Sequence, residues 1–390
     1  MSSITTSLSI VIQGHYYCAL FMWLSKRKQG EDIMSKKKNI NFDHNALERP
    51  TTHVLKTVEQ LYRQGYANPS AAYKEGREAA EMVEKAREKV AKALGCDANE
   101  IIFTSGASES NSWVQANYLL DVDGRSHHSL QRMTDLYVPR QLRAIPLVAS
   151  ETGECLINEI ASNQDKDYFV DLTQAIGKIK IDLHCLKNVM FASASGQKFG
   201  GIQGAGILYI SRKWKSKFKI MIYGSQENGL RGGTLNVPAI VAFGEAIEEA
   251  TKNMEKNNAK VKKIVNYIID EIYTGWEAPV FFDSGGYEIV NCKMPVGINH
   301  NTNVINITFN HLTATAAVQI FDKLGFNISA GSACNSESER PSEAYLASGY
   351  TEDEAMRTIR ISVGKNNTIK EAKKFIKALK KVVALYDEED

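Results

Sequence analysis

The segment Ser193-Ala194-Ser195-Gly196-Gln197-Lys198 is the part of the sequence on which the predicted fold and function both depend. It follows the apolar run 189–192, which predicts a buried strand, and it leads into the glycine-rich stretch 200–206. Small residues let the backbone pack closely, so a lysine in this setting can approach a flat cofactor. Taken alone, a lysine in a glycine-rich turn is more often a solvated loop residue, so the prediction needs support from other segments.

Asp171 provides that support. It ends the predicted strand 168–171, and a carboxylate at the carboxyl end of a parallel strand points into the ligand crevice of an α/β sheet. Pyridoxal phosphate requires such a partner, because an Asp keeps the pyridine nitrogen protonated and makes the ring an electron sink. The alternative is a helix cap for the segment that follows, which is the more common role of an isolated Asp.

The turn Gly106-Ala107-Ser108 is a candidate phosphate site. It follows the short apolar run 101–103 and opens the next predicted helix. A helix N-terminus presents free backbone N–H groups, and the Ser108 hydroxyl adds a further donor for a phosphate. Ordinary capping turns have the same sequence, so this motif gains weight only beside Lys198 and Asp171.

Two residues nearer the C-terminus have the chemistry of a substrate site. Cys334 lies in the small-residue loop 329–336, where an exposed thiol is reactive rather than structural. Arg360 lies among the apolar residues of the predicted strand 357–363, where a guanidinium needs a partner such as a carboxylate. The alternatives are an incidental surface thiol and an internal salt bridge.

The order of the predicted elements indicates two units. Strands alternate with helical segments up to about residue 210, which is typical of an α/β fold with a mostly parallel sheet and covered faces. Beyond a long predicted helix at 236–275, two strands and two helices form a smaller α+β unit. The predicted strands are 101–103, 144–149, 168–171, 189–192, 206–210, 303–309 and 357–363, and the other predicted helices are 70–94, 153–163, 313–324 and 369–385.

Bulk composition fits a globular protein of two domains. The chain has 390 residues, of which 43% are hydrophobic and 24% charged, and its formal net charge is +2. So small a net charge predicts neither direct nucleic-acid binding nor attachment to a membrane surface. The six cysteines form no CxxC pair, so we predict no metal site and no disulfide framework, and a reducing cytoplasm is the expected location.

Residues 1–33 differ from the rest of the chain. The stretch 8–24 is apolar, but polar residues at 13–15 interrupt it, and the basic cluster 26–28 follows it. That order is opposite to a secretory signal, and the run is too short and polar for a clear membrane span. We expect an N-terminal extension that is disordered or results from a mis-chosen start, with a weak membrane anchor as the alternative.

Together these segments resemble the cysteine desulfurases, in the class V aminotransferase-like branch of fold-type I pyridoxal-phosphate enzymes. The resemblance extends from about residue 40 to about residue 385 and rests on six ordered motifs. The motifs are 66–70 with 76–78, 102–111, 170–178, 195–198, 224–234, and 331–334 with Pro341, Ser342 and Arg360.

The resemblance implies a domain layout and a homodimer. A fold-type I large domain with a mostly parallel sheet would span 49–261, and a smaller α+β C-terminal domain at 262–390 would carry the catalytic cysteine loop. Residues 34–48 would form an N-terminal segment that joins the small domain. The motif 224–234 resembles a loop that completes the phosphate site of a neighbouring subunit, so we expect a homodimer in which Thr234 is donated to the partner.

The resemblance also implies roles for individual residues. Lys198 would hold pyridoxal phosphate, Cys334 would take sulfur from L-cysteine as a persulfide, and His127 would stack on the pyridine ring and move protons. A sulfur-acceptor protein would then receive the sulfur, for iron–sulfur cluster assembly or for RNA or DNA thiolation. The residues expected to bind the cofactor are Ala107, Ser108, His127, Ser150, Asp171, Gln174, Ser195, Gln197, Lys198 and Thr234, and those expected to bind the substrate are Arg360 and Ser150.

The sequence departs from the family pattern at several positions. Gln197 replaces a histidine before the lysine, Ser150 replaces an asparagine, and 46–50 replaces an Ala-Thr-Thr-Pro type of motif. Between the two adjacent histidines and Ser150 the chain is shorter than the family norm, which leaves His128 as an alternative to His127. The competing interpretations are a selenocysteine lyase or other class V lyase and a non-catalytic scaffold homologue.

Overall fold

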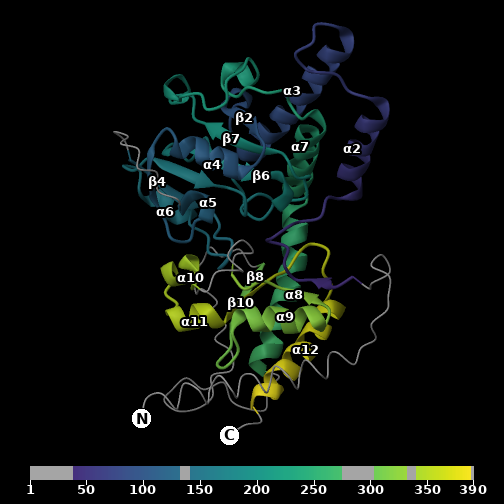
Figure 1. The fold of residues 1–390 in the computed structure, drawn as a ribbon, viewed down its shortest axis with the longest axis vertical. Helices are drawn as coiled ribbons and strands as arrows, with labels where there is room; N and C mark the ends of the chain where they lie inside the picture. The colour runs from purple at the N-terminus through teal and green to yellow at the C-terminus, as the bar shows by residue number, and fades with distance from the viewer. Residues whose placement is uncertain (1–37, 132–140, 275–302, 332–339, 388–390) are drawn as a thin grey trace.

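The structure is a computed structural model that describes residues 38–131, 141–274, 303–331 and 340–387. The predicted N-terminal extension and Cys334 lie outside these ranges. Figure 1 shows a larger part around one sheet and a smaller part around β8 and β10, with α7 and α8 running from one part to the other. None of the helices in the described ranges is long and apolar enough to cross a membrane.

The large sheet has six strands within the described residues, in the order β2-β7-β6-β5-β4-β3. Strands β3 to β6 pair in parallel, and β7 runs antiparallel to both β6 and β2. The prediction of an α/β fold with a mostly parallel sheet is therefore confirmed. The strands are β2 (Ile101–Thr104), β3 (Leu119–Val122), β4 (Gln141–Pro146), β5 (Tyr168–Asp171), β6 (Val189–Ser195) and β7 (Gly206–Ile210).

Helices cover both faces of this sheet, as its buried central strands require. Neighbouring residues on a strand point to opposite faces, so Val170 and Phe169 of β5 enter different hydrophobic clusters. Val170 packs in the cluster that includes α3 and α7, whereas Phe169 packs in the cluster that includes Trp113 of α4. The helices of this part are α2 (Thr52–Gln64), α3 (Lys74–Leu94), α4 (Ala107–Gln115), α5 (His128–Gln131), α6 (Ile157–Ser162) and α7 (Val237–Lys252).

Local sequence explains where the long helices begin and end. Gly95 ends α3 in the left-handed conformation, with φ 63°, which glycine adopts without strain. The side chain of Asn236 caps α7 by accepting a hydrogen bond from the Ala239 amide, and Pro238 lies in the first turn of that helix.

A second hydrophobic cluster forms around β8 (Val304–Thr308) and β10 (Thr358–Ser362), which pair antiparallel. The first strand of the chain, β1 (Ile40–Asn41), pairs in parallel with β9 (Phe326–Asn327), and Phe42 enters the same cluster. The N-terminal segment is thus fixed on the smaller part before it crosses to the larger one. The helices of the smaller part are α8 (Met254–Thr274), α9 (Ala314–Lys323), α10 (Glu343–Ala347), α11 (Glu352–Arg357) and α12 (Ile369–Asp387).

The prediction of a single helix at 236–275 was wrong. The side chain of Asn253 bonds back to the Glu249 carbonyl, so α7 ends there and α8 begins at Met254. Helix α8 then runs without interruption through the boundary that we placed at residue 261, so the domain boundaries stay predictions.

The bounds of other predicted elements were also wrong: the helix predicted at 70–94 begins at Lys74, and the strand predicted at 189–192 extends to Ser195. The helix predicted at 153–163 is shortened to α6, because Val148 and Cys155 form an antiparallel bridge around a turn at Gly153. The strand predicted at 144–149 is β4, which starts and ends three residues earlier.

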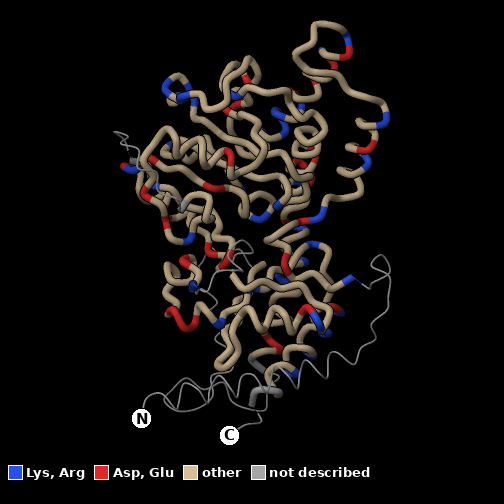
Figure 2. Tube along the Cα trace, in the orientation of Figure 1, with Lys and Arg blue, Asp and Glu red and all other residues tan. Residues whose placement is uncertain are grey.

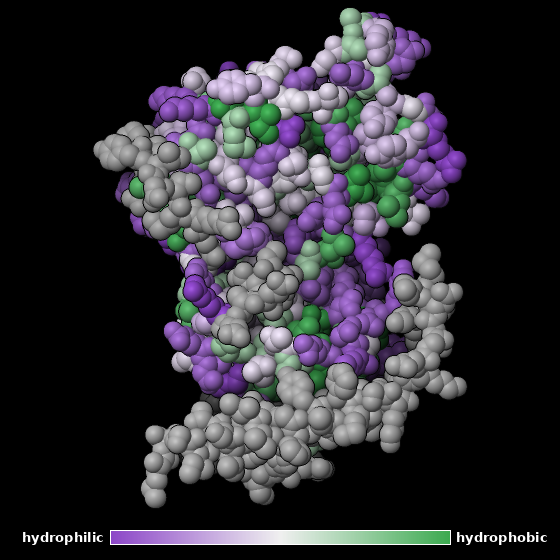
Figure 3. All heavy atoms as spheres, viewed as in Figure 1, coloured by the Kyte–Doolittle hydropathy of each residue, from purple (hydrophilic) through white to green (hydrophobic). Residues whose placement is uncertain are grey.

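Charge and hydropathy are mixed over the surface of the described residues. Basic and acidic residues are interspersed along the trace in Figure 2. On the face shown in Figure 3, hydrophobic residues form small separate groups among hydrophilic ones. This pattern accords with the net charge of +2.

Candidate active site

A cavity of about 400 Å³ opens at the carboxyl ends of β4, β5 and β6, beside the first turn of α4. This volume suits a small-molecule ligand, and the carboxyl ends of parallel strands are the usual place for one. Residues that lie far apart in sequence meet here. The predicted site residues that line the cavity are Ala107, Ser108, His127, Ser150, Asp171, Gln174, Ser195, Gln197, Lys198 and Arg360, together with the alternative His128.

Lys198 reaches the cavity from the 3₁₀ turn Gly196–Lys198, which follows β6. Its amine donates hydrogen bonds to the Ala46 carbonyl at 2.7 Å and to the Asn45 carbonyl at 3.2 Å. Glycine is needed at position 196, because a Cβ there would lie 2.8 Å from the Phe243 ring of α7. The turn therefore packs tightly against α7, which fixes the point from which the lysine extends.

Asp171 is the last residue of β5 and is almost fully buried. Its Oδ1 accepts a hydrogen bond from the Thr173 amide at 2.9 Å. Burial raises the pKa of this carboxyl, and the hydrogen bonds from Thr173 and the charge of Lys198 offset part of that rise. A positive charge placed beside Asp171 would stabilise its ionised form further.

The first turn of α4 supplies backbone N–H groups to the same cavity through Ala107 and Ser108. Glu109 would repel an anion there, but Arg231 binds its two oxygens at 2.9 and 3.1 Å. Burial alone would raise the pKa of Glu109, yet hydrogen bonds from Arg231 and Ser105 lower it. The carboxylate is therefore neutralised by its partner, and the helix N-terminus remains favourable to a phosphate.

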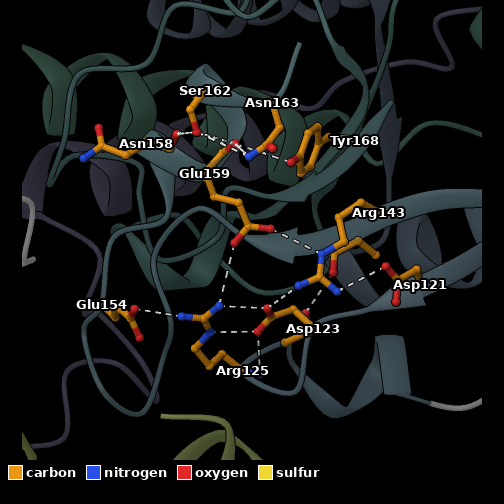
Figure 4. Close-up of polar contacts among 12 residues, drawn as sticks. Asp121, Asp123, Arg125, Arg143, Glu154, Asn158, Glu159, Ser162, Asn163 and Tyr168 are labelled. Atoms are coloured by element: carbon orange, nitrogen blue, oxygen red, sulfur yellow. Dashed lines mark hydrogen bonds and ion pairs between the residues drawn. The ribbon is translucent and has the colours of Figure 1, made fainter. Parts of the chain in front are cut away.

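A network of ion pairs supports the turn that precedes His127 (Figure 4). Arg125 donates two hydrogen bonds to the Asp123 carboxylate, and Arg143 binds that carboxylate at 2.7 Å. Glu154 pairs with Arg125 at 2.7 Å and thus extends the network beyond Asp123. Asp123 also accepts a hydrogen bond from the backbone N–H of Arg125, so the backbone just before the histidines is held in place.

His127 and His128 both line the cavity, with ring centroids 4.0 Å apart. Burial, together with the charges of His128 and Lys198, lowers the pKa of His127 to about 4. The imidazole is therefore neutral at physiological pH, so it can stack on a ring and accept a proton. The choice of His127 over His128 stays a prediction.

Arg360 extends from β10 of the smaller part into the cavity of the larger one. Its Nη2 binds Asp43 Oδ1 at 2.6 Å, and its Nη1 donates to the Ser150 carbonyl at 3.2 Å. The internal salt bridge considered as an alternative therefore exists, but it does not use the whole guanidinium. The Arg360 Nε atom is buried and has no hydrogen-bond partner among the described residues, which suits an incoming carboxylate.

The segment 43–48 belongs to the site, although no sequence motif predicted it. Asn45 donates to the Ser150 carbonyl at 2.9 Å and accepts from Lys178 and Asn303. The nearest of these partners is more than a hundred positions away in sequence, so no local pattern indicates the contact.

Two predicted site residues are not brought to this cavity within the described chain. Thr234 is exposed and does not line the cavity. Cys334 lies outside the described residues, although Gly331 before it lies close to Glu151, the residue that follows Ser150 of the cavity lining. The roles predicted for both residues stay predictions.

The family model described as Aminotransferase class-V matches residues 40–133 and 142–375. This chain belongs to the class V aminotransferase family. It is similar to the cysteine desulfurase IscS of Methanosarcina thermophila, with 28% identity over 400 residues that cover 91% of this chain and 94% of that protein.

Solved structures give the same result. The chain is similar to a NifS-like protein from Rickettsia africae ESF-5, with a TM-score of 0.76 and 26% identity over 90% of this chain and 99% of that one. It is also similar to a structure of SspA in complex with cysteine, with a TM-score of 0.66 and 26% identity over 84% of this chain and 99% of that one. The predicted family and fold are thus confirmed.

Family membership makes pyridoxal phosphate the cofactor, and the cavity fits its three functional ends. The Lys198 amine suits the aldehyde, the buried Asp171 carboxyl suits a protonated pyridine nitrogen, and the α4 N-terminus suits the phosphate. The position of Asp171 is the most telling of these features, because a buried carboxyl at the end of β5 gains most from a cationic partner.

Proposed function

We propose that this chain is a pyridoxal-phosphate-dependent cysteine desulfurase, which converts L-cysteine to L-alanine and keeps the sulfur as a persulfide on Cys334. The observation that carries the proposal is the meeting of Lys198, Asp171 and Arg360 at one cavity. The first two residues serve the cofactor, whereas a guanidinium serves the carboxylate of an amino acid. The likeness to IscS and to the structure of SspA with cysteine supports cysteine as that amino acid.

The residues of the large sheet would hold the cofactor. Pyridoxal phosphate, when bound, supplies a conjugated ring that stabilises negative charge on the substrate carbon. Asp171 would keep the ring nitrogen protonated, and the N–H groups of Ala107 and Ser108 would bind the phosphate. Lys198 would hold the aldehyde end and would later move protons with its amine, which the Asn45 and Ala46 carbonyls keep at the edge of the cavity.

Arg360 would orient the substrate. Its Nε–H, which has no partner in the described part of the chain, would bind the cysteine carboxylate, while Asp43 and the Ser150 carbonyl hold the other nitrogens of the guanidinium. His127, which is neutral because burial lowers its pKa to about 4, would face the ring and accept a proton.

The sulfur step needs a nucleophile in addition to the cofactor. The Cys334 thiolate would attack the substrate sulfur, so that an S–S bond forms while the C–S bond breaks. The electron pair of the broken bond stays on the substrate carbon, which takes up a proton to give alanine. An acceptor protein would then receive the persulfide sulfur, for iron–sulfur cluster assembly or for RNA or DNA thiolation.

We expect the active form to be a homodimer in the cytoplasm, where thiols stay reduced. Thr234 is exposed outside the cavity of its own chain, as a residue that is donated to a partner would be. Close to it in sequence, Ile220, Met221, Ile222 and Tyr223 are exposed hydrophobic residues that a partner would cover. Sedimentation of the cofactor-loaded protein should give a dimer, and an active monomer would contradict this expectation.

Turnover of L-cysteine by the purified, cofactor-loaded protein tests the proposed function. With a reductant present to release the sulfur, alanine and sulfide should form in equal amounts. A parallel assay with selenocysteine separates this activity from that of a selenocysteine lyase. Cofactor binding without any alanine formation would contradict the proposal and favour a scaffold role.

A further inference from the structure

Lys178 is a lysine that the proposed reaction does not use. It lines a small cavity of about 70 Å³, which Lys198, His44, Asn45 and Glu48 also line. It does not line the larger cavity where the cofactor would bind. The residue as a whole is half-buried, yet its amine donates hydrogen bonds inward, to Gln174 Oε1 at 2.7 Å and to Asn45 Oδ1 at 2.9 Å.

These contacts form a closed ring of hydrogen bonds. The Lys178 amine joins the side chains of Gln174 and Asn45, and Gln174 Nε2 in turn donates to the Asn45 carbonyl at 2.9 Å. That same carbonyl accepts a hydrogen bond from the Lys198 amine. The ring therefore links Gln174, which lines the cofactor cavity, to the residue that would hold the cofactor.

Several charged groups surround the Lys178 amine. Its pKa is lowered to about 7, because burial and the charges of Arg360 and Lys198 outweigh the opposing charge of Glu48. Of the other groups nearby, His44 pairs with Glu48 at 2.8 Å, and Lys365 lines the same small cavity. Below its pKa of about 7 the Lys178 amine is a cation, and a cation close to a second amine disfavours protonation of that amine, which is one way to keep a lysine nucleophilic.

We propose that Lys178 is a positioning residue of the cofactor site, which fixes Gln174 and the Lys198 amine through Asn45 and disfavours protonation of that amine by its charge. The proposal rests on the proposed function for the role of Lys198. It extends that function to a residue that touches neither the cofactor nor the substrate.

The consequences of losing Lys178 follow from the ring. Asn45 Oδ1 would keep its bond from Asn303, but Gln174 Oε1 would lose the donor that fixes it. A buried acceptor without a donor is costly, so the Gln174 amide would turn away from its present position. The Asn45 carbonyl would then hold the Lys198 amine less firmly.

Three variants separate the two parts of the proposal. Lys178→Met removes both the donor and the charge, Lys178→Gln keeps a neutral donor, and Lys180→Met removes an exposed lysine as the matched control. Two quantities are measured for each variant. One is the Kd of pyridoxal phosphate for the cofactor-free protein, and the other is the pH at which the visible absorbance of the bound cofactor changes.

For Lys178→Met we expect cofactor binding at least about tenfold weaker and an absorbance change at higher pH, because the neighbouring cation is gone. Lys178→Gln should recover most of the affinity but keep the raised transition pH. Lys180→Met should match the wild type in both quantities. Thermal unfolding of each variant shows whether it is folded. If Lys178→Met does not fold, the transition pH of Lys178→Gln decides whether the proposal holds.

The inference is overturned if Lys178→Gln has the transition pH of the wild type, or if a folded Lys178→Met also binds the cofactor as the wild type does. In either case a wild-type protein that still releases alanine from cysteine leaves the proposed function intact. A wild-type protein that does not bind pyridoxal phosphate would instead contradict both.

Discussion

The two walls of the active-site cavity are built in different ways. The wall on the large sheet consists of strand ends and the short segments that follow them, with Asp171 as the last residue of β5 and Lys198 just after β6. The opposite wall consists of Asn45, Ala46 and Arg360, and Asp43 of the same segment binds Arg360 only in the folded chain. Residues that would contact the cofactor thus lie in recognisable motifs, whereas the residues that position them are distributed over the sequence.

The largest effect is expected at the sheet wall, from Lys198→Ala. Without this amine the cofactor has no covalent attachment, so the absorbance of the bound cofactor and all cysteine turnover should disappear. Lys180→Ala removes an exposed lysine and should retain both. Absorbance that persists in Lys198→Ala would show that another residue holds the cofactor.

A strong but smaller effect is expected from Asp171→Asn. The amide no longer favours a protonated pyridine nitrogen, so the protein should still bind cofactor while turnover falls by at least about a hundredfold. The comparison variant is Asp165→Asn, an exposed residue before the same strand. If Asp171→Asn turned over cysteine at the wild-type rate, this residue would be merely a cap for the segment that follows.

On the opposite wall, Asp43→Ala tests the placement of Arg360. The guanidinium would lose the partner that binds its Nη2 at 2.6 Å, so the KM for cysteine should rise at least about tenfold, with a smaller change in kcat. Asp353→Ala breaks an exposed Asp–Arg pair of the same part of the molecule and serves as the control. A KM equal to that of the wild type would mean that Asp43 does not position Arg360.

The last expected effect is on stability rather than on activity, and it concerns His127. Its pKa is about 4 in the folded protein against an ordinary value of 6.5, so the unfolded chain binds more protons between these values. Stability of the cofactor-free protein should therefore fall as the pH drops from 6.5 towards 4.

Replacing His127 by Asn should remove that part of the pH dependence, which is on the order of 2 kcal/mol at pH 5. Urea unfolding of the wild type and of His127→Asn at pH 7 and pH 5 measures it, with His184→Asn as the exposed control. If the free energies of unfolding of the wild type and His127→Asn differ by the same amount at both pH values, the assignment of a buried, neutral imidazole is contradicted.

The sequence predicted much of the large sheet and most of the cavity lining. Apolar runs identified β2, β5, β6 and β7, and the motifs that follow these strands contain residues that the structure brings together. These predictions succeed because each depends on only a few neighbouring residues.

Other features depend on contacts that the sequence does not display. The apolar run of the edge strand β3 is short, is interrupted by the exposed Asp121 and contains no fully buried residue. The break between α7 and α8 depends on the side chain of a single residue, Asn253. The ring around Lys178 joins residues that are more than a hundred positions apart, so only folding makes it visible.

The most direct test of the central claim is mass spectrometry after brief exposure of the cofactor-loaded protein to L-cysteine. One added sulfur atom should appear on the peptide that contains Cys334, together with released alanine. Cys334→Ser should still bind the cofactor but should form neither product above background, because only a thiolate can accept the sulfur atom. Sulfur on a different cysteine, or alanine formed by Cys334→Ser at the wild-type rate, would contradict the account.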